Sequence, residues 1–270
     1  MQYDSFVMRA DICFSETPRS LKLYPDGWLV CLEGRSAGVF RALPERYAGL
    51  PVLDCAGSLM VPGLTDLHVH APQYAFRGQG MDLELLDWLD RYTFPEESKY
   101  ASLDYAGQAY RRFVEDVRRG PNTRACVFAT VPRPATIRLM DLLEESGLCT
   151  MVGKVNMDRN CPETLRETAA ASAQSTRTWL ERVEGRYSRT RPILTPRFIP
   201  SCTDELMGEL SRIQQQYGLP VQSHLSESQG EIAWVRELCP GARSYGHAYH
   251  EFGLLGGPAC PTIMAHCVHS

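Results

Sequence analysis

The sequence lacks several features that would place the protein in a particular class. Lys and Arg number 28 against 32 Asp and Glu, so no positive excess exists to attract nucleic acid or an anionic membrane. No apolar run approaches the roughly 18 residues that a membrane-spanning helix needs. The first residues, Met1–Ser5, lack the basic region and apolar core of a secretion signal. We therefore expect a cytoplasmic protein with neither nucleic acid nor membrane as a partner.

Cysteine pairs at metal-binding spacing are also missing. The chain has ten cysteines, and none forms a Cys-x-x-Cys motif, which argues against a structural zinc module. Without a secretion signal, reduced thiols are the expected state. The 270 residues are 44% hydrophobic, which is enough to bury a large core in one or two domains.

Two domains are predicted from a change of pattern along the chain. Residues 1–58 hold short apolar stretches between Pro- and Gly-containing turns, which indicates a small β domain. Over residues 59–270 strands and helices alternate. The expected strands are 59–69, 124–130, 149–156, 192–199, 219–225 and 262–268. The expected helices are 102–119, 135–146, 163–183, 203–217 and 228–238, with start signals at Ser102 and at 201–205 and a stop at Gly218.

Alternating strands and helices imply a parallel sheet, and short β-branched strands suit a sheet buried on both faces. A closed (β/α)8 TIM-like barrel is the leading candidate, because the informative polar residues fall at the carboxyl ends of strands. Only about six strands are present, so the barrel would be incomplete. The chain is then either a fragment of a longer protein, which we favour, or a smaller open sheet.

A His-x-His pair is the most informative motif. In Asp66-Leu67-His68-Val69-His70 the two imidazoles are two residues apart on a predicted strand, so they project to the same face. Two neutral imidazoles side by side are half of a zinc or iron site. Asp66 lies on that face too, one step deeper, either orienting an imidazole or serving as an interior polar residue.

Further candidates stand at other strand ends, namely Arg197, His224 and His266. Four of the seven histidines thus occupy such positions. Three nitrogen ligands and an open position make a catalytic metal site, which lowers the pKa of bound water to about 7. Glu227 follows His224 by three residues, where its carboxylate could move protons or simply face a helix dipole. Histidines that only satisfy backbone groups are the structural alternative.

Three other residues have plainer interpretations. Lys154 could bridge metals if modified, although an ion pair is the simpler role for it. His247 and His250 have helical spacing but lie among Gly and Tyr with no strand end nearby, so we expect them at the surface.

The segment Val61–His70 resembles the first barrel strand of the amidohydrolase superfamily. Later segments are similar, within that superfamily, to the guanine deaminase family. These segments are collinear from about residue 55 onward, and they are 70–74, 82–89, 92–96, 152–158, 195–198, 222–227 and 264–267.

The resemblance implies a metal-dependent hydrolase barrel that converts guanine to xanthine and ammonia, acting as a homodimer, which light scattering would test. It implies zinc, with iron possible, held by His68, His70 and His224, of which His70 and His224 also face the substrate. Three residues would address the purine: Gln73 its edge, Arg197 its carbonyl oxygen and Phe198 its ring. Glu227 would shuttle protons, and His266 would orient the attacking water or the substrate.

One departure from the family pattern matters. The family places a metal-binding aspartate at the end of the eighth strand, and this chain stops before that strand. We therefore expect these residues alone to bind zinc weakly and not to turn over guanine. Another purine or triazine aminohydrolase, and a non-catalytic binding or assembly protein, remain alternatives.

Overall fold

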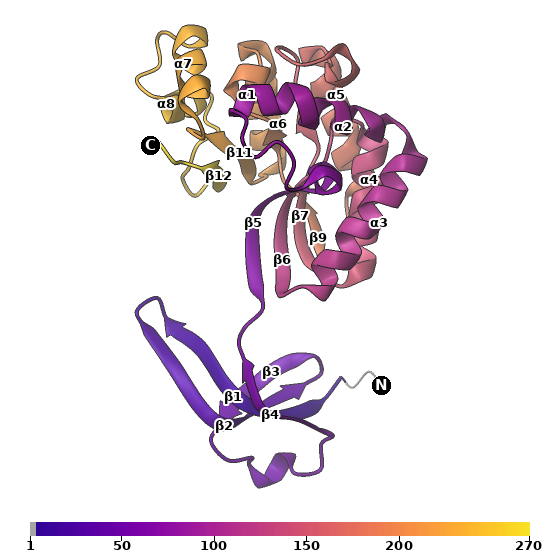
Figure 1. Ribbon diagram of the computed structural model, residues 1–270, viewed down its shortest axis with the longest axis vertical. Coiled ribbons are helices and arrows are strands. Elements are labelled where there is room, and N and C mark those ends of the chain that lie inside the picture. Colours follow the sequence, from indigo (N-terminus) through magenta and orange to yellow (C-terminus); the bar gives the residue numbers. More distant parts are fainter. Residues whose placement is uncertain (1–3) are drawn as a thin grey trace. The chain divides into compact units, whose positions relative to one another are not determined.

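The computed structural model describes residues 4–270, and the chain divides into two compact units, Met1–Gly63 and Leu64–Ser270 (Figure 1). The division lies a few residues beyond the predicted boundary at 58/59. The single strand predicted over 59–69 is in fact two strands: β4 (Val52–Met60) belongs to the first unit and β5 (Leu64–His70) to the second. Pro62 lies between them and has no backbone N–H to continue a ladder.

The first unit is a four-stranded sheet in the order β3-β2-β1-β4. Its other strands are β1 (Phe6–Thr17), β2 (Ser20–Leu32) and β3 (Arg35–Phe40), followed by the short helix η1 (Glu45–Tyr47). Glu33 and Gly34 have φ values of 50° and 73°, as a two-residue hairpin between twisted strands requires. Val7 and Val30 are fully buried in this small β domain.

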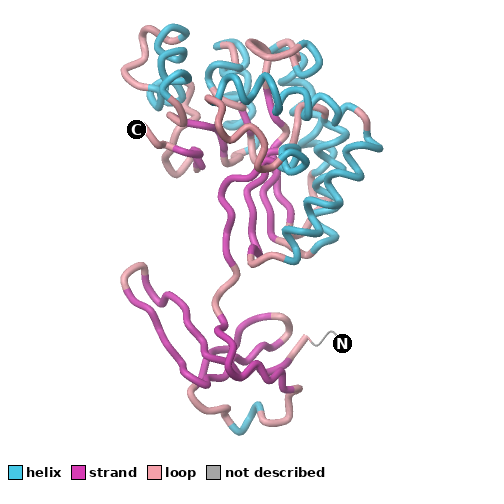
Figure 2. Tube along the Cα trace, viewed as in Figure 1, coloured by secondary structure: helices cyan, strands magenta, loops and turns pink. Residues whose placement is uncertain are grey.

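The second unit is built on parallel strands taken in chain order. Figure 2 shows these strands in magenta, with the helices in cyan. One sheet has the order β5-β6-β7-β9, and two further pairs, β8 with β10 and β11 with β12, continue the arrangement through a bridge between Leu194 and Val221. The strands are β6 (Asn122–Phe128), β7 (Cys149–Gly153), β8 (Val155–Asn156), β9 (Thr190–Pro192), β10 (Thr195–Pro196), β11 (Val221–Leu225) and β12 (Thr262–His266). This confirms the parallel α/β architecture, with six strand positions where a closed barrel has eight.

Helices cover these strands and form the main core. Fully buried Leu139, Trp179 and Leu210 pack with strand residues Val127 and Val152. The four helices α3 (Leu103–Arg119), α4 (Arg133–Ser146), α5 (Ala169–Val183) and α6 (Asp204–Tyr217) alternate with strands along the chain, and α7 (Gln229–Leu238) follows β11.

Two predicted helix boundaries are confirmed. The Ser102 side chain accepts a hydrogen bond from the Tyr105 N–H at the start of α3, and Gly218 takes a left-handed conformation, φ 62°, at the end of α6.

Other predicted boundaries were wrong. The helix predicted over 163–183 begins only at Ala169, after a Thr168 cap, because residues 163–165 form the separate turn η5 (Glu163–Leu165) behind Pro162. The strands predicted over 149–156 and 192–199 are each interrupted, the first at Lys154 and the second after Pro192. Helix α8 (Tyr245–Glu251) was not predicted. Several short helices were also missed: η2 (Ala71–Phe76), α1 (Leu85–Trp88), η3 (Leu89–Thr93), α2 (Phe94–Ser98), η4 (Lys99–Ala101) and η6 (Ile199–Ser201).

Glu144 ties the end of α4 to the start of β9. Its carboxylate accepts hydrogen bonds from the Ser188 hydroxyl and from the backbone N–H groups of Ser188, Arg189 and Thr190, at 2.6–3.0 Å. Burial alone would raise the pKa of Glu144, but these hydrogen bonds lower it to about 2.

Glu144→Gln is therefore expected to destabilise the fold by roughly 1 kcal/mol at neutral pH, after discounting for solvent screening. Because folding lowers the pKa of Glu144, its ionised carboxylate stabilises the folded protein at pH values above the pKa that it has in the unfolded chain. This stabilisation is lost as the pH falls toward 2. Urea unfolding at pH 7 and pH 3 should show the gap between wild type and variant shrinking on acidification. Glu145→Gln, at the exposed neighbouring position, is the matched control, and an equal gap at both pH values would contradict the assignment.

Candidate active site

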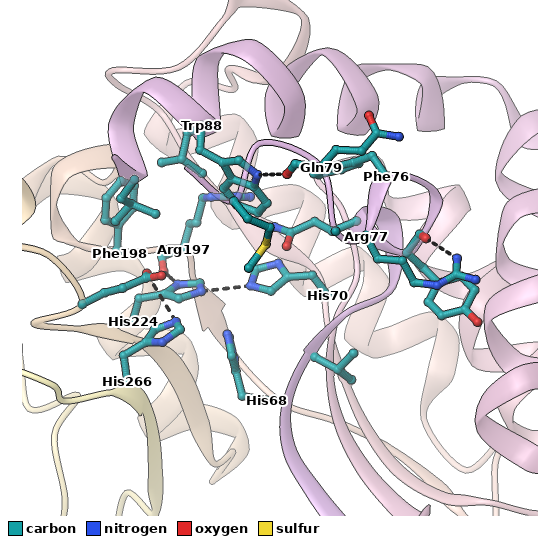
Figure 3. Close-up of a pocket in the computed structure, with 18 residues that line it drawn as sticks. His68, His70, Phe76, Arg77, Gln79, Trp88, Arg197, Phe198, His224 and His266 are labelled. Carbon is teal, nitrogen blue, oxygen red and sulfur yellow. Dashed lines mark hydrogen bonds and ion pairs between the residues drawn. The ribbon is translucent and has the colours of Figure 1, made fainter. Parts of the chain in front are cut away.

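Four imidazoles converge at the carboxyl ends of three strands (Figure 3). His68 and His70 come from the end of β5, His224 from β11 and His266 from the end of β12. The His68 ring centroid lies 4.9 Å from those of His70 and His224 and 5.0 Å from that of His266. Ring nitrogens of His68, His224 and His266 all lie within 4.8 Å of one another, so these three form a group able to hold a metal ion.

His70 adjoins the same point. Its Nε2 atom lies 2.9 Å from Nε2 of His224, close to the roughly 3.3 Å that separates two nitrogens bound tetrahedrally to one zinc. The Nδ1 atoms of His68 and His70 are buried without a hydrogen-bond partner among residues 4–270. Clustered imidazole nitrogens with unused lone pairs fit a divalent cation of the kind that nitrogen ligands bind.

The orientation of His224 is fixed by backbone contacts. Its Nδ1 lies 2.6 Å from the carbonyl oxygen of Arg197, which only accepts, so Nδ1 carries the hydrogen and Nε2 keeps its lone pair. The Tyr249 hydroxyl donates to the His224 carbonyl at 2.8 Å and also contacts the Ser223 hydroxyl at 2.7 Å. Such contacts hold a metal-binding imidazole in one tautomer and one ring orientation.

The imidazoles are neutral at physiological pH. Burial, followed by the nearby His266 and Arg197, lowers the pKa of His68 to about 4. Burial and the neighbouring imidazoles hold the pKa values of His70 and His224 well below the ordinary range, and burial also lowers the pKa of His266. Neutral rings keep the lone pairs that a cation needs.

Glu227 lies next to the imidazole cluster. Its Oε2 atom is 3.3 Å from Nε2 of His266. Its backbone N–H donates to the Glu231 carboxylate, which also completes a capping box with Ser228 at the start of α7. Burial, and then the charge of Glu231, raises the pKa of Glu227 to about 7, against the opposing effect of Arg197. A carboxyl group so placed can both accept and return a proton.

A cavity of about 390 Å³ opens beside the cluster. The eight residues to which the family resemblance assigns a role all line it: His68, His70, Gln73, Arg197, Phe198, His224, Glu227 and His266. The buried Arg197 guanidinium donates to Glu97 at 2.7 Å, and the Gln73 amide makes no hydrogen bond within residues 4–270. The chain thus places a guanidinium, an amide and an aromatic ring around one cavity that is open to solvent.

The remaining sequence candidates lie outside this cavity. Asp66 accepts a hydrogen bond from the His68 backbone N–H and is not bonded to an imidazole. Lys154 is buried in an ion pair with Glu167 at 2.7 Å, as the simpler interpretation predicted. His247 and His250 lie on α8, with His250 exposed.

Sequence reasoning missed the apolar wall of the cavity and the partner of Arg197. The wall comes from residues 76–89 and includes Phe76, Met81, Leu85, Trp88 and Leu89. In Figure 3 the Trp88 indole lies across the cavity from the imidazoles, and it donates to the Gln79 carbonyl at 3.0 Å. These residues lie in the connection after β5 and keep no single period. The segment 82–89 resembles the guanine deaminase family, but the sequence assigned no role to any residue in it.

Comparison with known proteins agrees with this geometry. A profile of the Amidohydrolase family matches residues 59–270. Guanine deaminase of Dictyostelium discoideum is 42% identical over 219 residues, which cover 81% of this chain and 48% of that protein. Guanine deaminase of Escherichia coli is 36% identical over 81% of this chain and 49% of that protein. The chain therefore spans about half the length of these curated relatives.

Solved structures show the same fold. A guanine deaminase from C. acetobutylicum, with guanine bound in its active site, superposes with a TM-score of 0.94 at 42% identity, over 98% of this chain and 63% of that one. A triazine hydrolase superposes with a TM-score of 0.77 at 14% identity, over 97% of this chain and 65% of that one. At this identity the comparison shows similarity of fold alone. The second unit thus has the TIM-barrel-like fold that the strand order indicates.

Proposed function

Because the chain belongs to the amidohydrolase family, we propose that the protein hydrolyses guanine to xanthine and ammonia with one bound divalent cation. The observation that carries the proposal is the placement of four imidazoles, Glu227 and Arg197 around a single cavity. The relatives named guanine deaminase, and the similar structure with bound guanine, support this substrate over other cyclic amidines.

We infer that His68, His70 and His224 hold the cation and that the cation is zinc, with iron as the other metal that such ligands take. A bound divalent cation supplies a Lewis acid that activates water for attack at neutral pH. His266, with Nε2 3.3 Å from Glu227, lies where it can orient the attacking water or the substrate. Among residues 4–270 no cysteine lines this cavity, which suits a hydrolytic rather than a structural zinc site.

Proton movement falls to Glu227. The water oxygen forms a bond to C2 of guanine, and the electron pair of the C2–N3 double bond moves to N3. Glu227 takes one proton from the water and delivers it to N3, which leaves a tetrahedral carbon. It then passes the second water proton to the amino group, the C2–N2 bond breaks, and ammonia leaves xanthine behind. Its position within reach of His266, at the edge of the cavity, supports this role.

Substrate recognition falls to three residues of the cavity. The Arg197 guanidinium suits the carbonyl oxygen of guanine, because a buried cation stabilises a polarised carbonyl. The Gln73 amide offers both a donor and an acceptor to the purine edge. Phe198, with its ring centroid 6.5 Å from that of His224, borders the purine ring.

A substrate panel tests the proposal. The product of the complete gene, loaded with zinc, should release ammonia from guanine at least about tenfold faster, by kcat/KM, than from adenine, cytosine or an amino-triazine. If the protein prefers a triazine or another purine, that compound and not guanine is the substrate. No release from any of them by zinc-loaded protein would favour a non-catalytic binding role.

We also propose a cytoplasmic homodimer. All ten cysteines are free, as a reducing compartment predicts. Among residues 4–270 no helix combines the length and apolar character of a bilayer span. The dimer rests on resemblance to the relatives alone.

A further inference from the structure

We propose that Glu97 is a positioning residue that aims the Arg197 guanidinium at the carbonyl group of the substrate, and so sets the preference for oxo-purines. This inference rests on the proposed function, and it assigns a role to a residue outside the cavity lining. Glu97 lies on α2, far in sequence from the strand ends that carry the other site residues.

The first observation is a buried ion pair. The side chains of Arg197 and Glu97 are 3% and 0% exposed, and Nη1 of Arg197 donates to Oε2 of Glu97 at 2.7 Å. A guanidinium this deeply buried requires a counter-charge, since an unpaired charge in an apolar interior is costly. Phe94, also on α2, lies with its ring centroid 5.4 Å from the guanidinium carbon. One short helix therefore contacts the guanidinium with both a carboxylate and an aromatic face.

The second observation is that this contact leaves donors free. Within residues 4–270 the bond to Glu97 is the only hydrogen bond of the Arg197 side chain, although a guanidinium has five N–H groups. Arg197 also lines the cavity. The geometry therefore engages one arm of a rigid fork and leaves the others available to an acceptor in the cavity.

The third observation concerns Glu97 itself. Its Oε1 atom is buried without a hydrogen-bond partner among the described residues. A buried carboxylate with one unpaired oxygen contributes little to stability, because the free-energy cost of removing its charge from water offsets much of its attraction to the guanidinium. Besides supplying the counter-charge, Glu97 fixes the direction of the Arg197 guanidinium through its hydrogen bond.

The neighbouring residue Glu96 provides a contrast. It is also buried, 7% exposed, yet it pairs with Lys99 at 2.7 Å and with the Tyr105 hydroxyl, and among residues 4–270 it makes no ion pair with Arg197. Glu96→Gln therefore removes a buried carboxylate from the same short helix without touching Arg197, which makes it a matched control.

The test compares two substrates in three variants of the zinc-loaded product of the complete gene. Guanine carries the carbonyl that Arg197 addresses, whereas 2-aminopurine carries the same amino group and no carbonyl. Glu97→Gln keeps the reach and loses the charge, and Glu97→Asp keeps the charge and shortens the reach. Both should lower the guanine to 2-aminopurine ratio of kcat/KM at least about tenfold, mainly through KM, while Glu96→Gln changes it less than about twofold.

Melting temperature and zinc content separate this effect from misfolding. If Glu97→Gln does not fold, Glu97→Asp alone decides the question. A guanine to 2-aminopurine ratio that stays unchanged, whether or not kcat/KM falls equally for both substrates, would overturn the positioning role. If 2-aminopurine is not turned over, the ratio of its inhibition constant to that of xanthine gives the same decision. Failure of the proposed function has a different signature, because the wild-type protein would then leave guanine intact.

Discussion

His224→Ala is expected to remove the metal and the activity together. In the zinc-loaded full-length protein, the variant should retain less than about a tenth of the zinc of the wild type. Its kcat/KM for guanine should fall by at least about 10³-fold, because water activation at neutral pH depends on the cation. The reason lies in the position of the ring: Nε2 faces Nε2 of His70 at 2.9 Å, and Nδ1 is fixed by the Arg197 carbonyl.

Metal content by mass spectrometry and ammonia release measure the two effects. His250→Ala, which removes an exposed imidazole on α8, is the matched control and should keep both zinc and activity. Full zinc content in His224→Ala would contradict the assignment of this residue as a ligand.

The same assay separates the roles within the cluster. If His68 and His70 are ligands, their alanine variants should lose zinc. If His266 only orients the water or the substrate, its alanine variant should keep zinc and lose turnover. The grouping of His266 with His68 and His224 within 4.8 Å makes this comparison informative, because distance alone would admit His266 as a ligand.

How much of the site could be predicted depended on where each residue lies. His68 and His70 follow from strand periodicity, since residues two apart project to one face whatever the rest of the fold does. Arg197, His224 and His266 follow from the rule that parallel strands bring their carboxyl ends to one edge. Local signals of this kind also predicted the Ser102 cap and the Gly218 terminus.

Residues brought in by irregular segments could not be predicted in this way. Glu97, Trp88 and Met81 belong to a stretch of short helices between β5 and α3, and their positions depend on tertiary contacts such as the Glu97–Arg197 ion pair. Pro62 could have indicated the break between β4 and β5, but the apolar residues on both sides of it led to the prediction of a single strand. His266 has φ 72°, a left-handed backbone conformation that the local sequence does not predict.

Glu227→Gln is expected to separate proton transfer from binding. The amide keeps the size and hydrogen-bonding reach of the side chain but cannot carry a proton between water, ring nitrogen and leaving amine. We expect kcat to fall by about 10²–10⁴-fold with KM changed by less than about threefold. Zinc content should stay at the wild-type level, because within residues 4–270 the Glu227 carboxylate forms its ion pair with His266 and not with any of the three proposed ligands.

Steady-state kinetics with guanine, together with zinc analysis, measure these quantities. Glu237→Gln removes an exposed carboxylate from the same helix, α7, and should behave as the wild type. A loss carried by KM alone would assign Glu227 to substrate binding, and a loss of zinc would assign it to the metal centre. Only a fall in kcat with metal and KM retained supports a carboxyl group that moves protons while the imidazoles and Arg197 hold the reacting groups in place.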